Sequence, residues 1–314
     1  MLKELFTLLF LILFINPLNS QIDKNTLLFV GHAYGSHKLE DQSIDLELQT
    51  FIKEQKDILF TKIIFGGDMI QNCEDDVEIS NFIKVLNENK TNFVIGNHDN
   101  CNKIIEIAKN RYGGLNSSEI INDNLLLYLN TSIQSDTEVE ELFSFIETET
   151  IRANPKNIII FSHQVFFSKS DFYVRVNSRK FYDYGNRLYD KIYNKFFARD
   201  IKIHFFAGDI GAFKYTPYAF YDKMNNFSFY AVGIGNLINS KGILIDPNEE
   251  VLVNFVDLKT KTIESKTKYI KYKVQFYQFP KLILSIIKFN IEFFLILLGL
   301  ILYLKLSKKN VAEN

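Results

Sequence analysis

The stretch Phe93-Val94-Ile95-Gly96-Asn97-His98-Asp99 decides how the rest of this sequence is interpreted. An apolar run that favours a strand stops at a glycine, and three polar residues follow at once. Asn97 offers a neutral oxygen to a metal, His98 exchanges a proton near neutral pH, and Asp99 is suited to hold that histidine in one orientation. Because α/β folds place their sites at the carboxyl ends of strands, the stretch predicts a site at a sheet edge.

The same arrangement recurs at four other places in the chain. Apolar runs lead into Gly31-His32, Gly67-Asp68, Ser162-His163 and Gly208-Asp209. Each of these ends carries a side chain that can bind a hard or borderline metal. One such end would be an ordinary turn, but five in series indicate a metal site assembled from strand ends.

Segments with a helical spacing of apolar residues separate these runs. They are residues 40–56, 75–88, 102–111 and 136–152, with 183–197 as a further candidate. The alternation predicts an α/β layered domain over residues 21–265. Strand-like pieces at Phe227–Val232 and Val251–Leu258 are typical of a second, antiparallel-rich half of the sheet structure.

Both ends of the chain carry apolar segments. Residues 1–20 predict a cleaved signal peptide, with an uncleaved signal anchor as the alternative. Residues 289–306 predict a transmembrane helix between a juxtamembrane segment, 266–288, and a lysine-containing tail, 307–314; a buried core helix is the alternative. Together they predict a membrane-anchored protein whose body lies outside the cytoplasm, in the periplasm, the extracellular space or the secretory pathway, with a short cytoplasmic tail.

Composition limits the partners and suggests one covalent link. The net charge of −1 over 314 residues gives no ground for a polyanionic partner, so no nucleic acid is expected. Two cysteines, Cys73 and Cys101, lie shortly after Asp68 and Asp99. In an exported protein such a pair suggests a disulfide, which would clamp the two loops; two free buried thiols are the alternative.

Residues 164–200 interrupt the alternation with many Phe, Tyr, Arg and Lys residues. This insertion lies between His163 and Asp209, where it could cover the site. Arg175 and Arg179 are candidates for binding a phosphate or an acidic sugar of the substrate. A solvated basic loop is the alternative interpretation.

The order of the polar clusters resembles the calcineurin-like metallophosphoesterase superfamily, which includes the purple acid phosphatases. That family runs Asp-x-His, Gly-Asp, Gly-Asn-His-Asp/Glu, a lone His after a strand, and Gly-His-x-His. Here Gly67-Asp68 and Gly96-Asn97-His98-Asp99 match outright, and Ser162-His163 matches the lone-histidine element. The resemblance covers about residues 26–258.

Two elements depart from the family pattern. The first reads Gly31-His32-Ala33-Tyr34, with His32 in the place of the family Asp and Tyr34 in the place of the His. The other alignment places Gly31 and Ala33 there, and we prefer the first because it keeps a ligand. The last element reads Gly208-Asp209-Ile210-Gly211, so Asp209 can still bind a metal whereas Gly211 has no side chain to offer.

The resemblance implies a four-layer αββα metallophosphoesterase sandwich, to which the apolar carboxyl-terminal segment adds the predicted transmembrane helix. It also implies two divalent transition metal ions, Mn, Fe or Zn, which mixed nitrogen and oxygen ligands suit. Asp68 would bridge both metals; Asn97, His163 and Asp209 would complete one; His32 would remain for the other, with Tyr34 as a further candidate. A single-metal or asymmetric centre stays open.

The implied activity is hydrolysis of phosphate esters by metal-activated hydroxide. His98 would be catalytic, protonating the leaving oxygen, and Asp99 would fix its orientation. The substrate would be a phosphorylated lipid, glycan or small metabolite outside the cytoplasm. The alternative is a non-catalytic binding or assembly module of the same fold at the cell envelope. His204 and His37 are interpreted as a core and a surface histidine.

Overall fold

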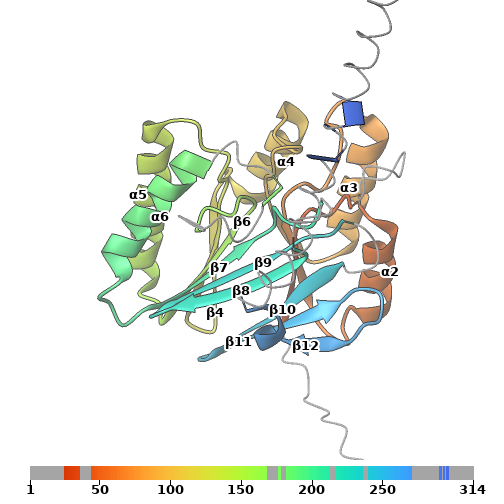
Figure 1. The fold of residues 1–314 in the computed structure, drawn as a ribbon. Coiled ribbons are helices and arrows are strands. Elements are labelled where there is room, and N and C mark those ends of the chain that lie inside the picture. Colours follow the sequence, from red (N-terminus) through yellow and green to blue (C-terminus); the bar gives the residue numbers. More distant parts are fainter. Residues whose placement is uncertain are drawn as a thin grey trace, which may run out of the picture.

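Two mixed β-sheets of six strands each form the centre of the described chain (Figure 1). The computed structural model describes residues 25–35, 44–167, 176–177, 182–212, 217–235 and 240–270, with residues 290, 291, 293, 295 and 296. Helices cover the outer faces of the sheets. The class is therefore α/β, as the alternation of apolar runs and amphipathic segments predicts.

The first sheet joins the amino-terminal strands to the carboxyl-terminal ones, in the order β12-β11-β10-β1-β2-β3. The strands β1, β2 and β3 run parallel, and β10 lies antiparallel beside β1. The members are β1 (Leu27–Val30), β2 (Lys62–Gly66), β3 (Thr91–Val94), β10 (Lys241–Pro247), β11 (Val251–Asp257) and β12 (Ile263–Ser265).

The second sheet has the order β4-β5-β6-β7-β9-β8. Its four inner strands are parallel, and antiparallel strands close both edges. The members are β4 (Ser117–Ile121), β5 (Asn124–Tyr128), β6 (Asn157–Ser162), β7 (Lys202–Ala207), β8 (Ala219–Met224) and β9 (Phe227–Val232).

Helices form the two outer layers. The apolar faces of α2, α3 and α4 pack on the first sheet, and those of α5 and α6 pack on the second. Figure 1 shows α5 and α6 side by side on one flank, with α2 and α3 on the other. Their bounds are α2 (Leu46–Gln55), α3 (Asp76–Glu88), α4 (Asn102–Tyr112), α5 (Asp136–Ala153) and α6 (Tyr182–Phe196), and a 3-10 turn, η1 (Lys266–Tyr269), follows β12.

Local sequence sets where these helices begin and end. Asp45, Asp75 and Ser135 precede α2, α3 and α5, and their side chains accept backbone N–H groups of the first turn. Such caps satisfy donors that a helix start leaves unpaired. At the end of α4, Gly113 takes a left-handed conformation with φ 79°. Glycine is favoured there because it has no side chain to oppose a positive φ.

An aromatic layer lies between the two sheets. The ring of Phe29 on β1 stacks on Phe161 of β6 at 5.5 Å and contacts Phe206 of β7 at 5.9 Å. Tyr128 of β5 continues the stack at 5.2 Å from Phe161. The order of layers is thus helices, sheet, sheet, helices. Burial of these large rings favours face-to-face packing of the sheets.

A buried amide pair joins the sheets at the end where β5 and β6 begin. Asn124 of β5 donates to the carbonyls of Pro247 and Asn248, in the turn after β10. Asn157 of β6 donates to Asn124 Oδ1 at 2.6 Å and to the carbonyl of Glu249 at 3.2 Å. These bonds fix that turn of the first sheet against the second.

The carboxyl-terminal strands pair mainly antiparallel, as the sequence suggested, but they are divided between the two sheets. The strand β9 lies parallel to β7 in the second sheet, whereas β10 and β11 belong to the first. Pairing of β10 with β1 joins segments more than two hundred residues apart, and no local pattern specifies it. The strands β4, β8, β10 and β12 were not expected from the sequence.

The two terminal predictions fall almost entirely outside the described residues. The signal peptide at 1–20, most of the juxtamembrane segment 266–288 and the tail 307–314 lie there, and within 289–306 only 290, 291, 293, 295 and 296 are described, as helix. In the described part of the chain, no helix combines the length and apolar character needed to cross a bilayer.

Candidate metal centre

The five candidate ligands follow strands of both sheets. His32, Asp68 and Asn97 come directly after β1, β2 and β3 of the first sheet. His163 and Asp209 come after β6 and β7 of the second. Because the carboxyl ends of parallel strands meet at one edge, the packed sheets bring these residues together, as the sequence predicts.

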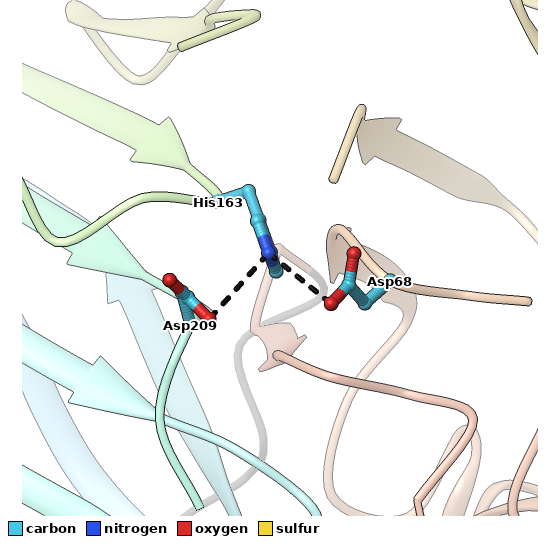
Figure 2. Close-up of side chains that lie close together, drawn as sticks. All are labelled: Asp68, His163 and Asp209. Carbon is cyan, nitrogen blue, oxygen red and sulfur yellow. Dashed lines mark ion pairs between the residues drawn. The ribbon is translucent and has the colours of Figure 1, made fainter. Parts of the chain in front are cut away.

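Four atoms that carry lone pairs converge at this edge. Nε2 of His163 lies 3.4 Å from Oδ2 of Asp68 and 3.7 Å from Oδ1 of Asp209 (Figure 2). The same nitrogen lies 3.3 Å from Oδ1 of Asn97. The two carboxylates and the imidazole offer ligand atoms that all lie within 4.8 Å of one another, and all three side chains are buried.

The spacing of these atoms fits a transition metal. Nitrogen and oxygen ligands bind Zn²⁺ at about 2.0–2.2 Å, and four such ligands in a tetrahedron lie about 3.3–3.6 Å from one another. The separations around His163 Nε2 fall close to this range. Buried acceptor atoms gathered so closely repel one another unless a cation or a proton lies between them.

The second ring nitrogen of His163 is held by the backbone. Nδ1 lies 2.8 Å from the carbonyl of Gly66, the last residue of β2. A carbonyl only accepts, so Nδ1 carries the proton and donates it. In the neutral ring this leaves the lone pair of Nε2 facing Asp68 and Asp209, an arrangement typical of metal-binding histidines.

His32 repeats this arrangement and approaches the same oxygen of Asp68. Its Nδ1 donates to the carbonyl of Ile234 at 2.9 Å, and its Nε2 lies 3.9 Å from Asp68 Oδ2. Burial lowers the pKa of His32 to about 4, although the charge of Asp68 opposes this. His32 is therefore neutral near pH 7, the form that can donate a lone pair to a metal.

The charges of His163 and the neighbouring carboxylates shift one another's pKa values. Burial acts to lower the pKa of His163, but the negative charges of Asp68 and Asp209 outweigh it and raise that pKa to about 10. Burial opposes ionisation of Asp68, yet His163 holds the pKa of this carboxyl well below its usual range. Without a metal, a proton on His163 thus occupies the position between the carboxylates.

Two glycines allow the strand ends to approach so closely. A Cβ atom at Gly67, where φ is 81°, would lie 2.5 Å from Nδ1 of His163. A Cβ atom at Gly96 would lie 2.2 Å from Oδ1 of Asp68. Neither contact is sterically possible, so glycine at both positions is required by the position of the ligands.

His98 lies beside the cluster and is held by backbone and side-chain contacts. Its Nδ1 donates to the carbonyl of Gln71 at 3.0 Å, and its Nε2 lies 3.5 Å from the hydroxyl of Tyr34. Its backbone N–H donates to Asp68 Oδ1 at 3.0 Å. Tyr34, considered from the sequence as a ligand of a second metal, directs its hydroxyl to His98.

The carboxylate of Asp99 accepts hydrogen bonds from backbone N–H groups and not from His98. Its Oδ1 accepts the N–H groups of Met69 and Ile70 at 2.9 and 3.1 Å, and its Oδ2 accepts that of Gly96 at 3.0 Å. The expectation that Asp99 orients His98 is corrected here, since the Gln71 carbonyl is the group on Nδ1. Burial and the charge of Asp68 raise the pKa of Asp99 to about 7.

Cys73 and Cys101 form a disulfide. The bridge joins the loop after β2 to the residue before α4, so it is the clamp considered from the sequence. Sγ of Cys73 also lies 3.1 Å from the backbone carbonyl of His98.

The proposed substrate residues Arg175 and Arg179 lie outside the described residues, as does His37. Between the two arginines, Asn177 is described and is anchored to the loop after β7. Its N–H donates to the carbonyl of Asp209 at 3.0 Å, and its Oδ1 accepts the N–H of Ala212 at 3.0 Å. The insertion is thus attached next to a candidate ligand.

His204 is a core histidine, as interpreted from the sequence. It lies on β7, is 7 % exposed, and stacks on Tyr230 at 6.5 Å. Neither of its ring nitrogens has a hydrogen-bond partner among the described residues. It is not one of the residues that converge on His163.

Sequence reasoning missed the groups that orient the three histidines His32, His98 and His163, each of which is held through its Nδ1. The carbonyls of Gly66, Gln71 and Ile234 are backbone atoms, which every residue possesses, so no residue type marks them. No protein-family model and no curated protein matches this sequence. The functional argument therefore depends on the geometry of the cluster.

Proposed function

We propose that this protein is a metal-dependent hydrolase of phosphate esters with the αββα metallophosphoesterase fold. The observation that carries the proposal is the convergence of Asp68, Asn97 and Asp209 on Nε2 of His163, whose Nδ1 is fixed by a carbonyl. The strand-end origin of these residues and the motif order in the sequence support it.

Asp68, Asn97, His163 and Asp209 would hold one divalent transition metal, Mn, Fe or Zn. His32 and Asp68 are the residues available for a second, and Tyr34 is turned to His98 instead. Two such protein ligands are fewer than the three usual in catalytic sites, so the first metal is the more tightly held of the two.

The bound metal would supply Lewis-acid activation of a water molecule and of the phosphoryl oxygens. The residues of the chain then have separate tasks. Nδ1 of His98 is engaged by the Gln71 carbonyl, so a proton for the leaving oxygen would come from Nε2 of the imidazolium form, the nitrogen beside the Tyr34 hydroxyl. The backbone N–H of His98 and the imidazole of His163 keep Asp68 in place.

The substrate proposed is a phosphorylated lipid, glycan or small metabolite, with Arg175 and Arg179 as phosphate-binding residues. We place the reaction outside the cytoplasm, on a chain anchored by residues 289–306. The Cys73–Cys101 disulfide supports this location, since disulfides persist in oxidising compartments.

Hydrolysis of chromogenic phosphate mono- and diesters by the purified full-length protein, loaded with Mn or Zn, tests the proposal. We expect turnover that EDTA abolishes and metal restores. His163→Ala should lose turnover and metal together, whereas His98→Ala should lose turnover by about 100-fold or more and keep the metal.

His204→Ala is the matched control, a buried histidine on β7 outside the cluster, and it should keep both metal and turnover. Full turnover in the metal-stripped protein, or in His98→Ala, would contradict the proposed mechanism. Metal binding without turnover on any ester would favour the alternative, a non-catalytic module that binds or assembles at the cell envelope.

A further inference from the structure

The loop between β2 and α3 contacts His98 at two points and is linked covalently to the chain that follows His98 at a third. The carbonyl of Gln71 accepts from Nδ1 of His98 at 3.0 Å, and Sγ of Cys73 lies 3.1 Å from the His98 carbonyl. The disulfide then joins Cys73 to Cys101, three residues after His98. The ring, the backbone and the following turn of this histidine are thus all held from one loop.

A buried carboxylate fixes the conformation of that loop. Oε2 of Glu78 accepts the N–H groups of Gln71 and Asn72 at 2.7 and 3.0 Å. Glu78 is 6 % exposed and lies in the first turn of α3, where the partial positive charge of the helix end stabilises a carboxylate. The N–H of Asn72 shares a peptide unit with the Gln71 carbonyl and points the opposite way, to Glu78, so this bond keeps the Gln71 carbonyl directed at His98.

We propose that Glu78 is a positioning residue for His98, acting through the Gln71 carbonyl, and that the Cys73–Cys101 disulfide closes the same support. This inference rests on the proposed function for its catalytic consequence, although the positioning itself is independent of turnover. The support fixes which nitrogen of His98 carries the proton in the neutral ring: Nδ1 is the donor to Gln71, and Nε2, beside the Tyr34 hydroxyl, keeps the lone pair.

The alternative interpretation of Glu78 is that it only stabilises the start of α3. Asp75 already performs that task, because its side chain accepts the N–H groups of Val77 and Glu78. Glu78 instead accepts amides of the preceding loop. The two acids therefore separate the effects: Asp75 supports the helix start, and Glu78 supports the loop that contacts His98.

The direct test is the tautomer of His98, read from the long-range ¹H–¹⁵N NMR spectrum of the full-length zinc-loaded protein in detergent. We expect the Nδ1–H form in the wild type. In Glu78→Ala, and in the Cys73→Ser/Cys101→Ser double variant, we expect a mixture of the two tautomers. Glu78→Gln keeps an acceptor oxygen and should restore the wild-type spectrum.

Asp75→Ala is the matched control, since it removes a carboxylate with two backbone bonds from the same helix turn. It should leave the tautomer of His98 unchanged. On a chromogenic ester, Glu78→Ala should lower kcat by about 10-fold or more with KM and zinc content unchanged, and Asp75→Ala should not.

An Nε2–H tautomer in the wild type would overturn the inference, as would equal spectral changes in Asp75→Ala and Glu78→Ala. An unchanged spectrum in the double cysteine variant would show that the disulfide takes no part in positioning His98. A zinc-loaded wild type that shows the expected tautomer and variant spectra, yet hydrolyses no phosphate ester, would overturn the proposed function and leave the positioning of His98 standing.

Discussion

Single backbone positions determine whether the ligands can meet. His32 and Asp68 both have positive φ, 49° and 51°, the left-handed region that residues other than glycine seldom occupy, although Asn, Asp and His are enriched there. Such residues cost about 1–3 kcal/mol each and tend to collect at functional sites. Both follow directly on the strand ends, where the chain turns its ligands inward. Backbone bonds from His32 to the Gly67 carbonyl and from Tyr34 to the Asp68 carbonyl hold them there.

Gly67 and Gly113 form a matched pair for testing this constraint, because their φ angles are 81° and 79°. An alanine at either position pays a similar conformational cost, about 1–2 kcal/mol. Only at position 67 would the new Cβ collide with His163, whereas nothing lies within 4 Å at position 113. Calorimetric zinc titration should show about 10- to 100-fold weaker binding in Gly67→Ala and unchanged binding in Gly113→Ala. Equal affinities in the two variants would contradict the steric argument.

His204 makes the free energy of unfolding depend on pH. Burial, and then the charges of Lys266, Lys202 and Lys223, lower the pKa of His204 to about 3. Between pH 6.5 and 3 the unfolded chain therefore binds a proton that the folded chain does not. Stability from this residue is complete above pH 6.5 and is lost as the pH falls.

Urea unfolding at pH 7 and pH 5 measures this contribution. Wild-type protein should lose about 2 kcal/mol more than His204→Leu over that interval. The same loss in both proteins would mean that His204 is protonated in the folded state, against its burial.

A site residue can be recognised in the sequence when its side chain, and not its backbone, performs its role. Asp68, Asn97, His163 and Asp209 were predictable because each follows an apolar strand and has ligand chemistry. The role of Asp99 was predicted wrongly, since a carboxylate next to a histidine suggests a side-chain pair, while the fold surrounds it with backbone amides. Gln71 carries no signal, because its contribution is its carbonyl.

At the scale of elements, the two sheets are joined at the end opposite the ligands by Asn124 and Asn157. Asn124→Ala would leave the carbonyls of Pro247 and Asn248 without its amide and Asn157 without its acceptor. Unsatisfied buried groups cost about 1–3 kcal/mol each. We expect a loss of about 2–4 kcal/mol in the free energy of unfolding, with zinc affinity unchanged.

Asn122→Gly is the control for this prediction. Asn122 donates to the Asn248 side chain in the same region but is exposed, and glycine tolerates its φ of 49°, so the substitution should change stability by less than about 0.5 kcal/mol. Equal effects of the two substitutions, measured by chemical unfolding, would show that the buried amides do not join the sheets.

Helices and parallel strands were predictable from local periodicity, and strand order was not. The apolar spacing of residues 75–88 and 136–152 gives α3 and α5 within one residue at each end. In contrast, β10 enters the first sheet beside β1 through contacts such as Leu28 with Leu244, which depend on the complete fold. The exposed edge strand β4 has no fully buried side chain, so its apolar signal is weak.

At the scale of the whole molecule, the disulfide bears on the extracytoplasmic location that we propose. The sequence has two cysteines, and both are in the bridge. Protein purified without reductant and denatured should therefore give no reaction with a thiol reagent, and two thiols per chain after reduction. Two reactive thiols before reduction would contradict the bridge and weaken the extracytoplasmic location that we propose.

The most direct test of the central claim is the metal content per chain of full-length protein purified from medium supplemented with Mn, Fe and Zn. We predict at least about one transition metal ion per chain in the wild type and in His204→Ala, and loss of that metal in His163→Ala and Asp209→Ala, with all four proteins folded by circular dichroism. A folded wild type without stoichiometric metal, or a metal that survives both ligand substitutions, would contradict the assignment of the cluster around His163 as a metal centre.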